Sequence, residues 1–76
     1  MPHVDLKYNP RNLSDEQKQS LANAIVEVLK QHLHTTDEAV SIAMHEVEAH
    51  DWKAEVYDPV IKPNLDTLAK KPGYEL

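Results

Sequence analysis

The second residue of the chain, Pro2, carries the most unusual chemistry in the sequence. Removal of an initiator methionine before a small residue is routine, and it would leave Pro2 as a secondary amine on a rigid ring. An α-amino group has a reference pKa of about 7.7–8.0, and apolar surroundings or a nearby guanidinium penalise its charged form. Such an amine can be neutral near pH 7 and act as a general base. Pro2 is therefore the leading candidate for a catalytic residue.

Arg11 and Trp52 are the single arginine and the single tryptophan of the chain. The planar guanidinium of Arg11 suits bidentate binding of a carboxylate. A lone loop arginine is more often a surface residue, but this one directly follows the first predicted strand and projects from the end of the sheet where parallel strands have their C-termini. Trp52 is either a packing residue or an apolar wall for a flat ligand. Taken alone, it favours packing.

The histidines predict no metal site. His32 and His34 lie two residues apart near a helix end and point to different sides, and His45 and His50 are not at a recognised ligand spacing. The chain has no cysteine and one glycine, which excludes disulfides, thiolate zinc sites and a glycine-rich phosphate loop. No cofactor is expected.

Net charge and hydropathy indicate which partners to expect. The formal net charge of −5 argues against a nucleic-acid binder. No apolar run approaches the roughly 20 residues of a membrane span, and the N-terminus lacks the apolar region of a signal peptide. The expectation is a cytoplasmic protein that binds neither nucleic acid nor membrane.

The first half of the chain predicts a strand and a long helix. Residues 3–8 alternate, with Val4, Leu6 and Tyr8 on one face, as in a half-buried strand. Ser14 with Gln17 matches a capping box and predicts a helix from about residue 15 to residue 33. The apolar residues of this helix recur at helical spacing: Leu21, Ala24, Ile25, Val28, Leu29 and His32/Leu33.

The second half predicts another strand and a shorter helix. Residues 40–47 alternate again, and a strand reached through a helical crossover is expected to be parallel to the first, in a right-handed β-α-β unit. Asp58 followed by Pro59 is typical of an N-cap and a first helical residue, which predicts a helix over 58–71 with Pro63 inside it. The whole chain, 1–76, is expected to be one α+β domain.

Association is the first expectation for so short a chain. Two strands do not form a stable sheet alone, and each leaves an edge that can pair with another chain. A homodimer would join two such units into a four-stranded sheet that carries the long helices on one face. The fold predicted from the residues is thus an oligomeric α+β layer.

The pattern resembles the 4-oxalocrotonate tautomerase family. The resemblance runs from Pro2 to about Trp52: an N-terminal proline opening an alternating strand, a loop arginine, and Ser14-Asp15-Glu16-Gln17-Lys18 at the start of the helix of a β-α-β unit. The ending, Lys70-Lys71-Pro72-Gly73-Tyr74, looks like a dimeric branch of that family, in which a C-terminal helix replaces the hairpin of the hexameric relatives.

The resemblance implies an isomerase that moves a proton between an enol oxygen and a carbon of a 2-hydroxydienoate or an enolpyruvate. Pro2 would be the base and then the acid, and Arg11 would hold a carboxylate. Trp52 would lie near the position at which the family has an aromatic residue in its substrate pocket. The hexameric relatives carry a second arginine where this chain has Ser41. A monocarboxylate such as phenylenolpyruvate is therefore expected as substrate, rather than a dicarboxylate, with Ser41 in the binding site.

Two other functions stay open at this point. The same fold with different chemistry would be a hydratase or dehalogenase of unsaturated acids, which typically needs further acid/base and arginine groups. A protein of another class would be a homodimeric binding module without chemistry, because each signal is weak in isolation.

Overall fold

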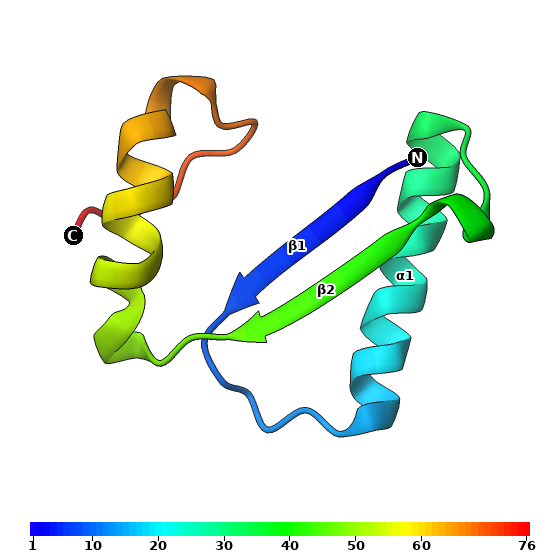
Figure 1. Ribbon diagram of the computed structural model, residues 1–76, viewed down its shortest axis with the longest axis horizontal. Coiled ribbons are helices and arrows are strands. Elements are labelled where there is room, and N and C mark those ends of the chain that lie inside the picture. The colour runs from blue at the N-terminus through cyan, green and yellow to red at the C-terminus, as the bar shows by residue number, and fades with distance from the viewer. The chain divides into compact units, whose positions relative to one another are not determined.

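A computed structural model describes all 76 residues, Met1–Leu76, which form two compact units, Met1–Glu46 and Val47–Leu76. The first unit is a β-α-β unit, as the sequence predicts (Figure 1). Its elements are the strand β1 (His3–Tyr8), the helix α1 (Asp15–Leu33), the 3₁₀ turn η1 (Asp37–Ala39) and the strand β2 (Ser41–Glu46).

The two strands pair in parallel, from His3 opposite Ser41 to Tyr8 opposite Glu46. In β1 the residues of one face, Val4, Leu6 and Tyr8, are half-buried, and those between them are exposed. This alternation confirms the predicted strand. β2 is one residue shorter at each end than the predicted 40–47.

Helix α1 begins and ends where the sequence predicts because its first turn is capped. The Ser14 hydroxyl accepts the Gln17 N–H at 3.1 Å, and the Gln17 side-chain oxygen accepts the Ser14 N–H at 2.8 Å. The acidic residues Asp15 and Glu16 complement the positive end of the helix. This reciprocal capping box satisfies two backbone donors that would otherwise have no partner.

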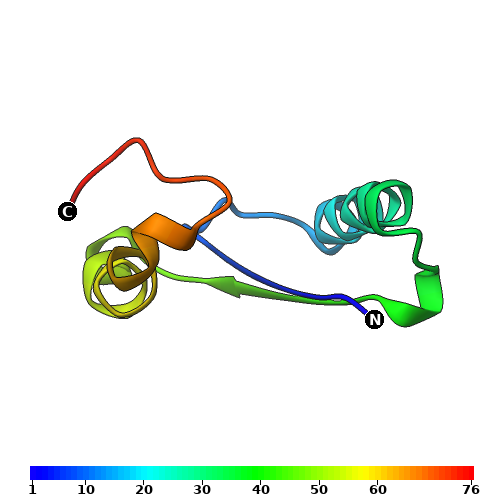
Figure 2. The same ribbon diagram turned by 90° about the horizontal axis from the view of Figure 1, so that it is seen from above.

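The apolar face of α1 is wider than the sheet beneath it. α1 covers one face of the two strands (Figure 2), and Ile25 and Leu29 are half-buried, as predicted. The remainder of the predicted apolar stripe is exposed, however, including Leu21 at 38%, Val28 at 53% and Leu33 at 58%. The physical reason is that two strands are too narrow to cover the whole stripe.

The second unit departs from the sequence prediction. Its helical segments are the 3₁₀ turn η2 (Ala49–Asp51), the π-helix η3 (Lys53–Ile61) and the 3₁₀ helix η4 (Lys62–Thr67). The predicted helix over 58–71 is therefore wrong in both its limits.

The prolines of this unit do not lie where the prediction places them. Asp58 and Pro59 lie inside η3 rather than at a helix start, and the Asp58 carboxylate binds the Lys53 ammonium at 2.9 Å. Pro59 lacks an N–H and so donates no backbone hydrogen bond within η3. Pro63 lies in the first turn of η4, where a missing N–H costs nothing.

The buried residues all belong to the second unit: Val47, Val56 and Tyr57. In the first unit every residue is half-buried or exposed. No helix of either unit has the length and apolar character needed to cross a membrane.

Candidate functional site

Pro2 is fixed at the start of the sheet by the neighbouring strand. Its carbonyl accepts the backbone N–H of Ser41 at 3.2 Å, one position before the first register pair of β1 and β2. A proline is tolerated at this position because it lies before the first residue of β1, and the bond to Ser41 uses its carbonyl rather than an N–H. Pro2 is half-buried and belongs to the same face of the strand as Val4 and Leu6.

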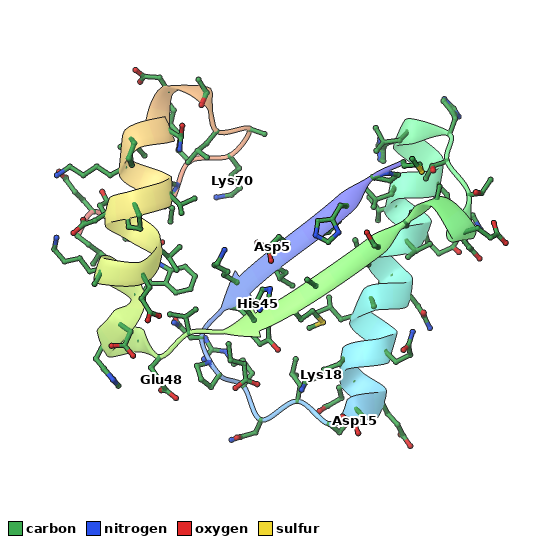
Figure 3. The ribbon with its side chains drawn as sticks, viewed as in Figure 1. Asp5, Asp15, Lys18, His45, Glu48 and Lys70 are labelled. Carbon is green, nitrogen blue, oxygen red and sulfur yellow. The ribbon has the colours of Figure 1, made fainter.

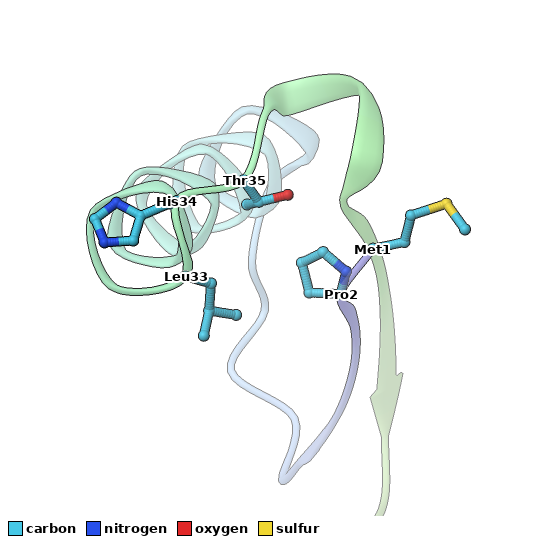
Figure 4. A pocket seen from close by; sticks show the side chains of 5 residues that line it. All are labelled: Met1, Pro2, Leu33, His34 and Thr35. Atoms are coloured by element: carbon cyan, nitrogen blue, oxygen red, sulfur yellow. The ribbon is translucent and has the colours of Figure 1, made fainter.

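An open pocket of about 330 Å³ lies beside Pro2 (Figure 4). It is lined by Met1, Pro2, Leu33, His34 and Thr35. Sequence reasoning missed the last three residues as parts of a site. The signal was available in the topology, because the helix of a β-α-β unit runs antiparallel to its strands and its C-terminus therefore lies at their N-terminal ends.

The backbone at the end of α1 shapes one wall of this pocket. His34 caps the helix in the left-handed conformation, with φ 54° and ψ 41°, and its N–H donates to the Lys30 carbonyl at 3.1 Å. Glycine is the usual residue at this position, and a histidine there is uncommon. The chain turns sharply at His34, so the residues before and after it both line the pocket.

The charges around the pocket are unfavourable to an anion. The C-terminus of α1 carries the partial negative charge of the helix dipole. Lys30 is paired with Asp37 at 3.1 Å and with Glu27 at 3.4 Å. The hydrogen bond to Asp37 is the main reason that the pKa of Lys30 is raised above its ordinary value. This end of the chain therefore offers a carboxylate no unpaired lysine or arginine.

Arg11, the unpaired cation of the loop after β1, lies at the other end of the sheet. Its side chain is exposed, and the guanidinium donates to the carbonyl of its neighbour Pro10 at 3.2 Å. The six residues of β1 lie between Pro2 and the loop that carries Arg11, and six residues at about 3.3 Å each span roughly 20 Å. Within one chain the structure does not bring Pro2 and Arg11 together.

Ser41 does lie close to Pro2. Besides its backbone bond to the Pro2 carbonyl, its hydroxyl contacts Nδ1 of His3 at 2.7 Å. Ser41 is thus the one predicted binding residue that the structure places next to the predicted base.

Trp52 belongs to the second unit, where it is half-buried. Its indole N–H donates to the Tyr74 hydroxyl at 2.9 Å, and the Tyr74 ring lies 5.9 Å from the Tyr57 ring, centroid to centroid. These contacts are those of the packing role, and they also fix the orientation of the indole plane.

A charged network occupies the middle of the two strands. The Asp5 carboxylate contacts Lys7 at 3.2 Å and His45 at 3.0 Å, and Figure 3 shows Asp5 and His45 on neighbouring strands. The hydrogen bond from Lys7 is the main cause that lowers the pKa of Asp5. All three side chains are exposed, so the network is solvated.

Comparison with known proteins identifies the class. The model of a family described as "Tautomerase enzyme" matches residues 2–57. The chain belongs to this tautomerase family and is an isomerase, as the resemblance implies. This result favours the enzyme over the binding module among the predicted functions.

Named relatives resemble the chain along its length. It is 55% identical over 74 residues, 97% of each chain, to "Tautomerase PptA" of Pectobacterium carotovorum. It is 51% identical to the protein of that name from Cronobacter sakazakii and 42% identical to the one from Escherichia coli, in both cases over the full length of both chains.

Proposed function

We propose that the protein is a cofactor-independent keto–enol tautomerase in which Pro2, freed by removal of Met1, is the general acid/base. The substrates proposed are enolpyruvate-type or 2-hydroxydienoate carboxylic acids, with phenylenolpyruvate as the representative. The observation that carries the proposal is the placement of Pro2, tethered through its carbonyl to Ser41 and lining an open pocket of about 330 Å³.

The reaction requires one proton carrier. The neutral amine of Pro2 takes the proton from the enol oxygen. The electron pair of the broken O–H bond forms the π bond of the carbonyl, and the π electrons of the C=C bond move to the neighbouring carbon. The resulting ammonium then returns the proton to that carbon, which yields the keto acid and the neutral amine. A base fixed to the first residue of a strand is held in position for both transfers, and positioned acid/base groups typically contribute about 10²–10⁴-fold in rate.

The carboxylate of the substrate needs a cation that the Pro2 end of one chain lacks. We assign this role to Arg11 of a second copy. A two-fold axis that joins two sheets edge to edge pairs the strands antiparallel. The Tyr8 end of one β1, with the Arg11 loop after it, then approaches the end of the sheet where the partner's β1 begins. The site would be complete only in a homodimer, with Ser41 beside Pro2 as a polar contact and Trp52 as an apolar wall.

The exposed face of α1 supports the homodimer independently. Leu21, Val28 and Leu33 are 38%, 53% and 58% exposed, and in the first unit no side chain is fully buried. A 46-residue unit with so little buried surface needs a further source of stability, and association is the common one.

The ketonisation of phenylenolpyruvate, followed in the ultraviolet, tests the proposal with the wild type and Pro2→Ala. Intact mass first establishes that Met1 is absent from both proteins. We expect Pro2→Ala to lose at least about 100-fold in kcat/KM, because an alanine amine is primary and flexibly held. Equal rates in the two proteins would overturn the role of Pro2. Halide release from a chloroacrylate at a rate comparable with ketonisation would favour the dehalogenase instead.

A further inference from the structure

The wall of the Pro2 pocket that α1 provides has two neighbouring side chains with different chemistry. Leu33 is a large apolar residue that is 58% exposed, and Thr35 is half-buried. Both line the pocket together with Pro2. Neither contributes to the proton transfer or to carboxylate binding as proposed above.

The conformation of His34 presents these two side chains to Pro2. With φ 54° and ψ 41°, His34 reverses the chain between the last turn of α1 and the connector. In Figure 4 the Thr35 side chain extends to the side of the pocket where Pro2 lies, and the His34 ring is directed away from it. Residues other than glycine adopt this conformation in only a few positions of the chain, Asn12 and His34.

The Thr35 hydroxyl has no hydrogen-bond partner in the protein, and Thr35 lines the same pocket as the predicted base, Pro2. Half-buried hydroxyl groups usually find a partner within the protein or in solvent. Thr36, the next residue, is exposed, and its side chain makes no capping bond to η1. Two adjacent threonines thus differ in one respect that matters here, which is access to the Pro2 pocket.

We propose that Thr35 is a substrate-contacting residue whose hydroxyl donates a hydrogen bond to the enol oxygen, the atom from which Pro2 takes the proton. This inference rests on the proposed role of Pro2. The oxygen gains negative charge as its proton leaves, and a donor already in position stabilises that charge more than it stabilises the bound substrate. Thr35 keeps its own proton throughout, so the balance of the reaction is unchanged.

Leu33 completes the wall as the contact for the carbon chain of the substrate. Its exposed side chain faces the same pocket as Thr35. Met1 also lines the pocket and is fully exposed, and its removal frees the Pro2 amine.

The test compares Thr35→Val with Thr36→Val, a matched pair in adjacent positions, using the Met1-free full chain and phenylenolpyruvate. Valine keeps the shape of threonine and removes the hydroxyl. We expect kcat of Thr35→Val to fall about tenfold with KM changed by less than about twofold, because the bond is stronger in the transition state. Thr36→Val should match the wild type, and Thr35→Ser should recover most of the lost rate.

Three outcomes would overturn the inference. The first is an unchanged kcat in Thr35→Val, and the second is a loss confined to KM, which would indicate binding of another substrate group. The third is an equal loss in His34→Gly, a variant that suits the left-handed backbone and removes the imidazole. Pro2→Ala is assayed in parallel: if it retains wild-type activity, the proposed function fails, whereas a Pro2-dependent enzyme with normal Thr35→Val kinetics refutes the role of Thr35 alone.

Discussion

The two ends of the β-α-β unit differ in almost every chemical property. At one end lie Pro2, the pocket and the C-terminus of α1, with its partial negative charge and a lysine already paired to acids. At the other end lie the exposed guanidinium of Arg11 and the capped N-terminus of α1. The first end has a pocket beside Pro2 and lacks an unpaired lysine or arginine, and the second has such a cation but no N-terminal amine.

Under the proposed function, one chain holds Pro2 and Arg11 too far apart to act on the same substrate. A carboxylate substrate at Pro2 would face the negative end of α1, and β1 keeps Arg11 roughly 20 Å away (six residues at about 3.3 Å each). An antiparallel second copy would supply the missing charge. The separation of the two ends is thus itself the strongest argument for a shared site.

The largest expected effect comes from mixing two inactive variants. Pro2→Ala and Arg11→Ala should each lose most of their activity as homodimers. After joint unfolding and refolding, half of the dimers are mixed, and each mixed dimer holds one site with both defects and one intact site. We therefore expect about a quarter of the wild-type activity to return.

Each variant refolded alone is the control for that recovery. Mixtures that stay as inactive as their components would show that Pro2 and Arg11 act within one chain or that Arg11 is dispensable. If Arg11→Ala alone keeps wild-type kcat/KM, Arg11 does not bind the substrate carboxylate and the two ends do not form one site.

The next effect concerns the helix that joins the two ends. Val28 is 53% exposed on the outer part of the apolar stripe of α1. Val28→Glu should convert the proposed homodimer to monomers and abolish activity, because burying an unpaired carboxylate costs several kcal/mol. Light scattering after gel filtration measures the mass, and Gln31→Glu, also exposed on α1, is the control for added charge. A Val28→Glu protein that keeps the mass and activity of the wild type would show that this stripe is solvated.

The sequence predicts one end of the unit far better than the other. The Arg11 end is encoded locally: Ser14 and Gln17 form the expected capping box, and the helix begins at the expected residue. The Pro2 end depends on a left-handed histidine and on which residues the crossover brings beside the strand. Helix propensity and periodicity do not encode either of these, so the sequence does not predict that Leu33 and Thr35 line the pocket beside Pro2.

The same distinction explains the second unit. The dipeptide Asp58-Pro59 has the local chemistry of a helix start, but both residues lie within a π-helix that starts five residues earlier, at Lys53. The dipeptide predicts a helix in this region but gives the wrong first residue. Tertiary packing around Val56 and Tyr57, both buried, determines where the helix begins.

A smaller effect tests how much the capped end contributes to stability. Ser14→Ala removes the hydroxyl that accepts the Gln17 N–H at 3.1 Å, and we expect the free energy of unfolding to fall by about 1 kcal/mol. Ser20→Ala, at a serine exposed within α1, should not lower it, because alanine has the higher helix propensity. Urea unfolding at one fixed protein concentration measures both, since the stability of a dimer depends on concentration. Equal stability in Ser14→Ala and the wild type would mean that association, rather than the cap, determines the start of α1.

The smallest expected effect concerns Asp5, midway between the two ends. Lys7, and to a smaller extent His45 and His3, lower its pKa in the folded protein, so the folded state holds the proton less tightly than the unfolded state does. Asp5 therefore contributes stability above its ordinary pKa, and this contribution is lost as the pH falls through the lowered value. Asp5→Asn should be slightly less stable than the wild type at pH 7, and the difference should shrink as the pH falls below the ordinary pKa of an aspartate and through the lowered pKa of Asp5. Because all three strand partners are solvated, added salt should also shrink the difference at pH 7.

Urea unfolding of Asp5→Asn beside Asp66→Asn, an exposed aspartate outside the sheet, measures this dependence. A difference that grows toward acid pH would show that Asp5 opposes folding instead, and that the strands between the two ends are held together by their backbone ladder and half-buried face alone.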